Sequence, residues 1–312
     1  MTSPERPDRP DHVQILMATH NGAEWLAGQL GSFAAQSHGD WSLVAGDDAS
    51  TDGTRNCLDR FAATHPGRVT WHEGPGRGSA ANFLALAERS MPGAWIAFSD
   101  QDDVWNPNRL ERALAASAPV RSGEPVVYAS ATLLTDAALR PLGPSSLPPP
   151  RGVFFGNALV QNVLAGNTLV LSPGAAALLR DAAPAALAAD VPFHDWWIYQ
   201  LMTGAGARIV YDPEPGLMYR QHGGNVLGAH RGLAAGFSRA GQILRRDYAG
   251  WIDRNVAALT SVETILTDDA RRQLREFAAA RHRPEALRKL GICRQTRAGD
   301  RVLAAMARTG RL

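Results

Sequence analysis

Three clusters of polar side chains in the first third of the chain have residue types that could bind a charged ligand. Each cluster follows a short apolar run: residues 19–22 (THNG), 47–54 (DDASTDGT) and 100–103 (DQDD). Clustered carboxylates repel one another unless a cation or hydrogen-bond donors offset their charge. Mg²⁺ and Mn²⁺ favour such oxygen ligands and can bridge them to the phosphates of a substrate. The pattern therefore predicts a metal-assisted site for a phosphate-bearing ligand.

The clusters differ in how strongly they indicate a ligand. Asp47 and Asp48 could instead form a turn, with Asp52 capping the next helix, because Asp is favoured at both kinds of position. An Asp-x-Asp triplet alone is common in loops. Three aspartates among residues 100–103, directly after an apolar run, point more strongly to a functional site.

The alternation of segments predicts a scaffold that brings these clusters together. Apolar runs of strand type alternate with helical patterns through the first 135 residues. We expect strands over 13–18, 41–45, 69–72, 95–99 and 126–131, and helices over 23–36, 52–64, 79–89 and 107–116. This order predicts an α/β fold with a largely parallel sheet covered by helices on both faces. Ligands bind beyond the carboxyl ends of such strands, where all three clusters lie.

The rest of the chain has a different pattern, which begins after a Pro-rich break over residues 141–151. We expect helices over 153–163, 173–180 and 194–203, strands over 168–172, 208–211 and 217–220, and tail helices over 233–248, 255–266, 269–280 and 285–295. The chain thus divides into residues 1–228, with halves at about 13–135 and 151–228, and a basic helical region at 229–312.

Several motifs, taken together, resemble glycosyltransferase family 2. They are A-x-x-N-G after the first strand, GDDASTDGT after the second and SDQDDVWNPNRL after the fourth. HDWW at 194–197 and YRQHGGNV at 219–226 resemble the bacterial rhamnosyltransferase-like branch of the family. The resemblance covers about residues 13–228 in family order and spacing. It implies the GT-A fold, an α/β structure with a mixed, mainly parallel sheet and helices on both faces, here followed by a C-terminal α-helical region.

The resemblance implies a site for a nucleotide-sugar donor with Mg²⁺ or Mn²⁺. The metal would be held by Asp102 or Asp103, which stay as alternatives, together with His222. Asn225 would contact phosphate or order its loop. The glycine-rich segment around Arg77 leads into a helix N-terminus, which suits an anion, but it could equally be an ordinary turn. The residues expected to contact the donor are Thr19, Asn21, Gly22, Asp47, Asp48, Arg77, Asp100, Gln101 and Arg220.

The resemblance assigns Asp195 as the catalytic base. An inverting transfer needs a base that takes the proton of the acceptor hydroxyl as it attacks the anomeric carbon. A metal and a cationic side chain would stabilise the departing nucleoside diphosphate. Asn167 belongs to a segment that floors the sugar pocket, and Trp196 and Trp197 either pack in the core or line the acceptor site. Without the resemblance, Asp195 would be an ordinary acidic residue in the first turn of a helix.

The implied reaction is a metal-dependent transfer from dTDP-rhamnose, or from a UDP-hexose, to a hydroxyl of a glycan, glycolipid or natural product. One alternative is a sugar-nucleotidyltransferase, but residues 18–22 lack a Gly-rich basic loop and no lysine precedes Lys289. Another is a non-catalytic carbohydrate- or lipid-binding protein on a degenerate transferase fold. The retained carboxylates Asp100, Asp102 and Asp195 argue against it.

Charge is distributed unevenly along the 312 residues. The net charge of +2 combines 17 basic and eight acidic side chains over residues 231–312, a net of +9, with a net of −7 over residues 1–230. The tail is either a solvated face of packed helices or a dock for anionic membrane lipid, for which the apolar and Arg side chains of 233–246 are suited. It has no nucleic-acid-binding signature.

The sequence shows no feature that would direct the protein out of the cytoplasm. The polar, Pro-rich start lacks the apolar segment of a signal peptide, the two cysteines suggest no disulfide framework, and no stretch is apolar enough to span a bilayer. We therefore expect a cytoplasmic location, with peripheral contact at the inner face of the cell membrane as a further expectation.

Overall fold

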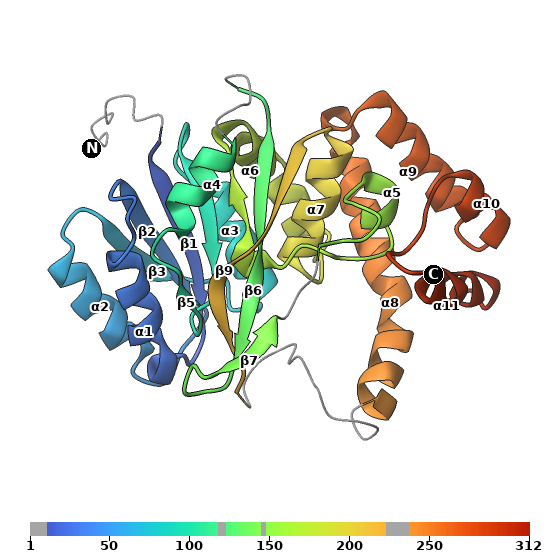
Figure 1. Ribbon diagram of the computed structural model, residues 1–312. Helices are drawn as coiled ribbons and strands as arrows, with labels where there is room; N and C mark the ends of the chain where they lie inside the picture. The colour runs from blue at the N-terminus through green and yellow to red at the C-terminus, as the bar shows by residue number, and fades with distance from the viewer. Residues whose placement is uncertain (1–10, 118–122, 145–147, 223–236) are drawn as a thin grey trace.

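The computed structural model describes residues 11–117, 123–144, 148–222 and 237–312, which form one mixed sheet with helices on both faces (Figure 1). The strand order is β3-β2-β1-β4-β8-β6-β9-β5, with β7 paired to β6. Pairing is parallel among β1 to β4 and between β6 and β9, and antiparallel where β8 joins β4 to β6. The strands are β1 Val13–Thr19, β2 Trp41–Asp47, β3 Val69–Glu73, β4 Trp95–Ser99, β5 Val104–Trp105, β6 Val126–Thr135, β7 Pro141–Pro144, β8 Val170–Leu171 and β9 Arg208–Arg220.

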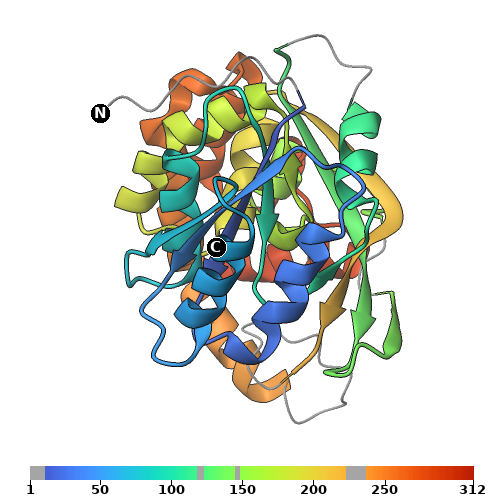
Figure 2. The same cartoon turned by 90° about the vertical axis from the view of Figure 1, so that its left-hand side faces the viewer.

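The period of two in β1 explains why helices cover both faces of the sheet. Ile15 and Met17 pack into one hydrophobic cluster with α1, α2 and α4, whereas Leu16 and Ala18 pack into another with α3, α6 and α7. Figure 2 shows α1 and α6 on opposite sides of the sheet. The predicted α/β class with a mixed sheet is confirmed. The helices of this part are α1 Ala23–Ala34, α2 Thr54–Thr64, α3 Ser79–Glu88, α4 Arg109–Ser117, α5 Phe155–Ala158, α6 Pro173–Ala188 and α7 His194–Gly204.

The second half differs from the prediction in three elements. The helix expected over 153–163 is only the single turn α5, and the two strands expected over 208–211 and 217–220 are one strand, β9. A register shift opposite Ala131 in β6 accommodates the prolines of β9, which had suggested a break. Helix α6 continues through Pro184 to Ala188, because its small side chains are fully buried against the sheet.

Helix α2 begins later than predicted, and Asp52 is not its N-cap. Gly53 occupies that position. The Asp52 carboxylate instead accepts hydrogen bonds from the backbone of Thr54 (3.0 Å) and of Ala23 (3.1 Å). It therefore ties the starts of α1 and α2 together.

The C-terminal helices are part of the main hydrophobic core. They are α8 Phe237–Ser261, α9 Asp268–Ala280, α10 Pro284–Lys289 and α11 Arg297–Arg308, at the right of Figure 1. Leu259, Phe277 and Leu303 belong to the same buried cluster as Trp197 and Leu201 of α7. Residues 248–312 therefore share a hydrophobic core with the sheet and its helices. From residue 237 onward, the two helices expected over 233–248 and 255–266 are one helix, α8, and α11 was not predicted.

The three arginines of α9 and the arginine that follows it have acidic partners. Arg271, Arg272 and Arg275 pair with Asp268, Asp269 and Glu263 respectively, and Arg281 pairs with Asp253 of α8. The positive charge of α9 is thus largely compensated locally. Among the described residues, no helix combines the length and apolar character needed to cross a bilayer.

Candidate active site

The ends of β1 and β2 bring two predicted clusters into contact. The register places Thr19 opposite Asp47, and the Thr19 hydroxyl donates to Asp47 Oδ1 at 3.1 Å. Asn21 has a positive φ of 47°, and its Oδ1 accepts from the backbone N–H of Thr51 at 2.8 Å. These bonds cross between loops about 30 residues apart, so the first two clusters form one structural unit.

Gln101 joins the third cluster to the first. It accepts a hydrogen bond from the N–H of His20 and donates one to the His20 carbonyl, each at 2.9 Å. Its side chain lies against Gly22, where a Cβ atom would overlap the Gln101 amide, so a larger residue at this position would have to displace Gln101 from its bonds to His20. The predicted residues Asn21, Gly22 and Gln101 therefore lie together at the same edge of the sheet.

Asp47 is fully buried and its carboxylate is well satisfied. It accepts from Ser50, from Thr19 and from Arg55 Nε at 2.6 Å. Burial alone would raise its pKa, but these hydrogen bonds, led by Ser50 and Arg55, lower it below the usual value. Asp47 is therefore a fixed anion at the end of β2.

Asp48 holds the glycine-rich loop. Its two oxygens accept from the N–H groups of Gly76 (2.6 Å) and Gly78 (2.7 Å), so this carboxylate takes the donors that the sequence suggested for a phosphate. Arg77 points away and pairs with Asp190 at 2.9 Å. That Arg77 reaches the donor stays a prediction.

Four carboxyl groups gather below this edge: Asp100, Asp102, Asp103 and Asp195. Burial raises the pKa of Asp100 well above its usual value, and the negative charges of the other three raise it further. Burial, followed by the charge of Asp102, raises the pKa of Asp103 to about 7. Such a cluster favours a bound cation, because a cation would relieve the mutual repulsion.

Asp103 faces the interior. It is fully buried, its Oδ2 accepts from the side chain of Asn167 at 2.6 Å, and its Oδ1 accepts from the backbone of Arg220 at 3.4 Å. The Asn167 amide therefore holds the carboxylate of Asp103. The metal role predicted for Asp103 and the sugar-pocket role predicted for Asn167 stay predictions.

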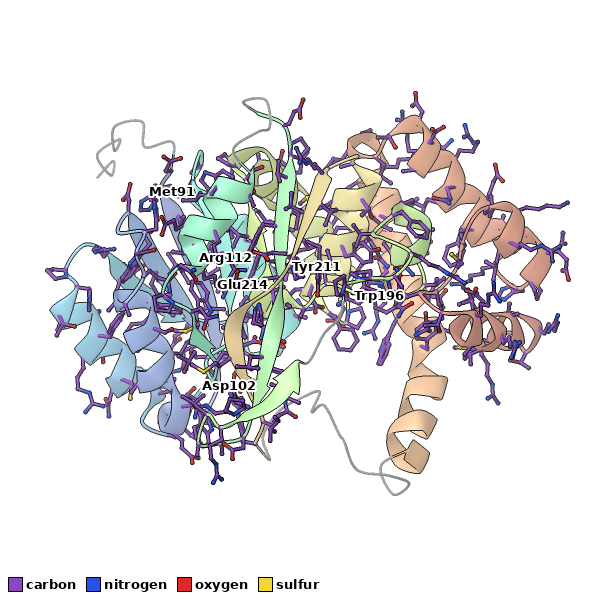
Figure 3. The ribbon with its side chains drawn as sticks, viewed as in Figure 1. Met91, Asp102, Arg112, Trp196, Tyr211 and Glu214 are labelled. Carbon is purple, nitrogen blue, oxygen red and sulfur yellow. The ribbon has the colours of Figure 1, made fainter. Side chains whose placement is uncertain are left out.

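Asp102 is the acidic residue that meets His222. Oδ2 of Asp102 and Nε2 of His222 lie 2.8 Å apart, and both side chains are partly exposed. Figure 3 shows Asp102 at the lower edge of the sheet. Among the residues that the structure describes, no three His, Cys, Asp or Glu side chains are placed to hold a metal together. One carboxylate and one imidazole nevertheless fit Mg²⁺ or Mn²⁺, since such ions complete their coordination with water and substrate phosphates.

Arg220, predicted to contact the donor, is held by protein partners in the structure. Its Nε donates to the carbonyl of Asp102 (2.9 Å), its Nη1 donates to the carbonyl of Ala137, and its guanidinium lies 4.8 Å from the ring centre of Trp25. It is 6% exposed. The end of β9 is thereby fastened to the acidic loop. Asn225 lies outside the described residues, as do the side chains of 237–247.

Arg109 was missed by the sequence reasoning, although it lies within the SDQDDVWNPNRL motif. Its guanidinium is fully buried 3.7 Å from the ring centre of Trp105. Burial lowers its pKa to about 9, while Tyr128, Asp103 and Asp100 oppose that shift. Arg109 therefore places a positive charge beneath the acidic cluster. A basic residue seven positions after Asp102 was the available signal.

Asp195 lies in the first turn of α7, in contact with the loop before β8. Its oxygens accept from the backbone of Trp196 (2.7 Å) and of Gly166 (3.3 Å), and from the side chain of Asn162. Burial outweighs these bonds and raises its pKa to about 6. A carboxylate with this pKa is largely ionised at neutral pH yet basic enough to accept a proton.

The two tryptophans after Asp195 are core residues. Trp197 is fully buried. Trp196, labelled in Figure 3, donates from Nε1 to the carbonyl of Ala158 at 2.6 Å and stacks on Tyr248. Of the two interpretations left open, core packing is the one that the structure supports.

Comparison with known sequences identifies a family and several relatives. The model of "Glycosyl transferase family 2" matches residues 14–184. A dTDP-rhamnosyl transferase of Shigella flexneri, RfbG, is 25% identical over 268 residues, which cover 81% of this chain and 86% of the relative. WfgD of Escherichia coli, a UDP-Glc:alpha-D-GlcNAc-diphosphoundecaprenol beta-1,3-glucosyltransferase, is 30% identical over 103 residues, 33% of this chain and 40% of the relative.

Solved structures share the fold along almost the whole chain. TarS 1–349 of S. aureus, in complex with UDP-GlcNAc, has a TM-score of 0.51 at 15% identity and covers 96% of this chain and 92% of its own. The mannosyltransferase PcManGT of Pyrobaculum calidifontis, in complex with GDP-Man and Mn²⁺, has a TM-score of 0.50 at 20% identity, covering 97% and 89%. At these identities the likeness concerns the fold.

Proposed function

The chain belongs to glycosyl transferase family 2, and from that premise we propose that it moves a sugar from a nucleoside-diphosphate donor to an acceptor hydroxyl with inversion, assisted by Mg²⁺ or Mn²⁺. That it is a glycosyltransferase with the GT-A fold follows from the family and its structural neighbours. The reaction, the metal and the substrates are the proposal. The observation that carries it is the buried Asp195 carboxylate beside the Asp100–Asp103 cluster, at the edge where the β1, β2 and β4 loops meet.

The proposed chemistry assigns one proton transfer to Asp195. Its carboxylate accepts the proton of the acceptor hydroxyl while the hydroxyl oxygen bonds to the anomeric carbon. The bond from that carbon to the diphosphate oxygen breaks, and the electron pair leaves with the nucleoside diphosphate. Gly166 and Asn162 keep the carboxylate oriented through their hydrogen bonds. Asp102 and His222 would hold the divalent ion, which offsets the negative charge that develops on the leaving diphosphate.

For the donor we propose dTDP-rhamnose first and a UDP-hexose second. The relative that matches most of this chain is named a dTDP-rhamnosyl transferase, and that name supports the first choice. The support for metal dependence is the group of carboxylates Asp100, Asp102 and Asp103, because a bound cation would relieve their mutual repulsion.

We also propose that the acceptor is a glycan, a glycolipid or a natural product, and that the protein is cytoplasmic with peripheral contact to the inner face of the membrane. The support for membrane contact is the net positive charge of residues 231–312, which is +9. Within it, α11 presents three arginines on its exposed side, Arg297, Arg301 and Arg308, for which no ion pair is found in the described part of the chain. An anionic lipid surface would attract such a face.

The test of the proposed function is a panel of dTDP-, UDP- and GDP-sugars with Mg²⁺ or Mn²⁺. We expect nucleoside diphosphate to be released from at least one donor, and that release to stop when EDTA removes the metal. Calorimetry should detect binding of the same donor. If no sugar nucleotide is hydrolysed, transferred or bound, the proposal is wrong.

Replacing Asp102 by Ala should weaken metal-dependent nucleotide binding about tenfold or more, because it removes the exposed carboxylate of the Asp102–His222 pair. Titration of Mn²⁺ with UDP or dTDP present measures the effect. Asp181→Ala, on the exposed side of α6, is the matched control and should bind like the parent chain. Unchanged affinity in Asp102→Ala would move the metal to other residues.

Gly166→Ala should reduce the transfer rate about 100-fold. A Cβ at this position would lie 2.6 Å from Nε2 of His194 and 3.1 Å from Cβ of Asp195. The ring centroids of His194 and Phe83 are 4.1 Å apart, so the His194 ring has little room to shift. We therefore expect Asp195 to move instead. A misplacement of a catalytic group by about 1 Å can reduce a rate about 100-fold.

The control for that variant is Gly31→Ala, on α1, where a Cβ meets no atom within 4 Å. It should keep the parent rate. Initial rates with the donor found by the panel measure both variants, and donor binding by calorimetry should stay within a few-fold for Gly166→Ala. A parent-like rate for Gly166→Ala would show that the loop does not position Asp195.

A further inference from the structure

Trp25, the third residue of α1, packs against the candidate metal site and not in the core. Its ring stacks on His222 with a centroid distance of 5.0 Å and an interplanar angle of 25°. The guanidinium of Arg220 lies over the same ring at 4.8 Å. Trp25 is thus in contact with two residues from the end of β9, nearly 200 positions away in the sequence.

Core packing does not explain this tryptophan. The residues by which α1 anchors to the sheet are Leu26, Leu30 and Phe33, all buried in the cluster that covers that face. Trp25 is only partly buried and belongs to neither hydrophobic cluster. A large aromatic side chain whose ring contacts are an imidazole and a guanidinium indicates a role at the site.

The contacts of Trp25 converge on one residue, Asp102. Arg220 Nε donates to the Asp102 carbonyl at 2.9 Å, and His222 Nε2 lies 2.8 Å from the Asp102 carboxylate. Trp25 supports both of these partners from the other side. The backbone and the side chain of Asp102 are therefore each held by a residue that rests on the Trp25 ring.

We propose that Trp25 is a positioning residue for His222: its ring fixes the plane of the imidazole so that Nε2 stays directed toward Asp102, in readiness for a divalent cation. Groups that orient a metal ligand typically change metal affinity by about 10- to 100-fold when they are removed. The inference rests on the proposed metal-dependent function. The sequence motifs suggested no role for Trp25. The one available signal was its position three to four residues after Asn21 and Gly22.

The test uses the full chain and measures Mn²⁺ binding by the loss of the free Mn²⁺ EPR signal, with UDP and, separately, dTDP present. Trp25→Leu should bind Mn²⁺ about tenfold more weakly than the parent, because leucine lacks the flat surface. Trp25→Phe, which keeps a stacking ring, should stay within about threefold. Metal-free nucleotide binding should be the same in all three. Parent-like Mn²⁺ affinity in a folded Trp25→Leu chain would overturn the inference.

A double-mutant cycle with His222→Asn separates positioning from general damage to the fold. If Trp25 acts through His222, Trp25→Leu should weaken Mn²⁺ binding in the parent but change it little in the His222→Asn background. Equal losses in both backgrounds would overturn the inference. Should Trp25→Leu fail to fold, Trp25→Met takes its place in the cycle, because methionine keeps an apolar side chain suited to a helix without a ring.

The parent chain distinguishes this inference from the proposed function. If the parent takes up no Mn²⁺ with either nucleotide, the metal-dependent function is wrong and the role of Trp25 is overturned with it. If the parent binds Mn²⁺ and Trp25→Leu binds it equally well, only the role of Trp25 is overturned.

Discussion

The Asp195→Asn enzyme is expected to lose about three orders of magnitude in kcat while binding the donor nearly as well as the parent. Removal of a general base typically costs 10²- to 10⁴-fold. Asparagine keeps the size of the side chain. Its one oxygen can still accept from one of the two N–H groups, that of Trp196 or that of Gly166, which donate to different oxygens of Asp195. It cannot accept the proton of the acceptor hydroxyl, so the loss should appear in the chemical step and not in binding.

The pH dependence should identify the same group. The pKa of Asp195 is raised to about 6 by burial, and the base works only when it is deprotonated. For the parent, kcat/KM should therefore be constant above pH 7 and fall about tenfold for each pH unit below about 6. This acid limb should vanish in Asp195→Asn.

Initial rates of nucleoside diphosphate release, with calorimetry for donor affinity, check this prediction. Asp181→Asn makes the same chemical change at an exposed position of α6 and should retain both rate and pH profile. Equal loss of transfer and of donor binding in Asp195→Asn would reassign Asp195 to the donor site. A parent-like rate would exclude it as the base.

A chain that ends at residue 236 is not expected to fold. Its missing helices contribute fully buried side chains to the core that surrounds α7, and a domain is stable by only about 5–15 kcal/mol. Polar contacts would be lost as well. Gln295 donates to the carbonyl of Gly152 (2.8 Å) and to Asn157 (3.0 Å), and it accepts from the backbone of Arg151 (2.9 Å).

A point substitution measures the same effect in the full chain. Phe277, on α9, is fully buried, and Phe277→Ala should lower the free energy of unfolding by about 3–5 kcal/mol. The melting temperature should fall by roughly 10 °C. Glu276→Ala, the exposed neighbour, is the control and should melt like the parent. Melting of the two variants at the same temperature would contradict the prediction.

This expectation changes how membrane contact has to be tested. Deletion of the basic region would remove core side chains together with surface charge, so loss of vesicle binding would carry no information about lipid. Substitution of exposed arginines on α11, which has its buried side at Leu303 and Ala307, changes the charge and leaves the core intact.

Several features could be predicted because they depend on residues close together in the sequence. The strands were recognisable from short apolar runs, and the turns after them from Asn, Asp and Gly. Parallel pairing of β1 with β2 and β4 then required that the polar clusters meet at one edge. The contacts of Thr19 with Asp47 and of Gln101 with His20 follow from that geometry.

Other features could not be predicted because they depend on partners far along the chain. Asp102 and Asp103 are equivalent in the sequence, yet Asp103 is held inside by Asn167 and Asp102 meets His222, a residue 120 positions away. The directions of Arg77 and Arg220 were likewise decided by Asp190 and by the carbonyls of Asp102 and Ala137. The type and spacing of a residue do not specify which way its side chain turns.

By itself, then, the sequence determined the class of fold, the edge of the sheet that carries the site and the family chemistry that this edge suggests. The tertiary structure alone decided which carboxylate is exposed, which arginines are already engaged, and that the C-terminal helices belong to the core. The physical reason is that apolar periodicity and turn propensity act over a few residues. Burial and hydrogen-bond partners arise only when distant segments pack together.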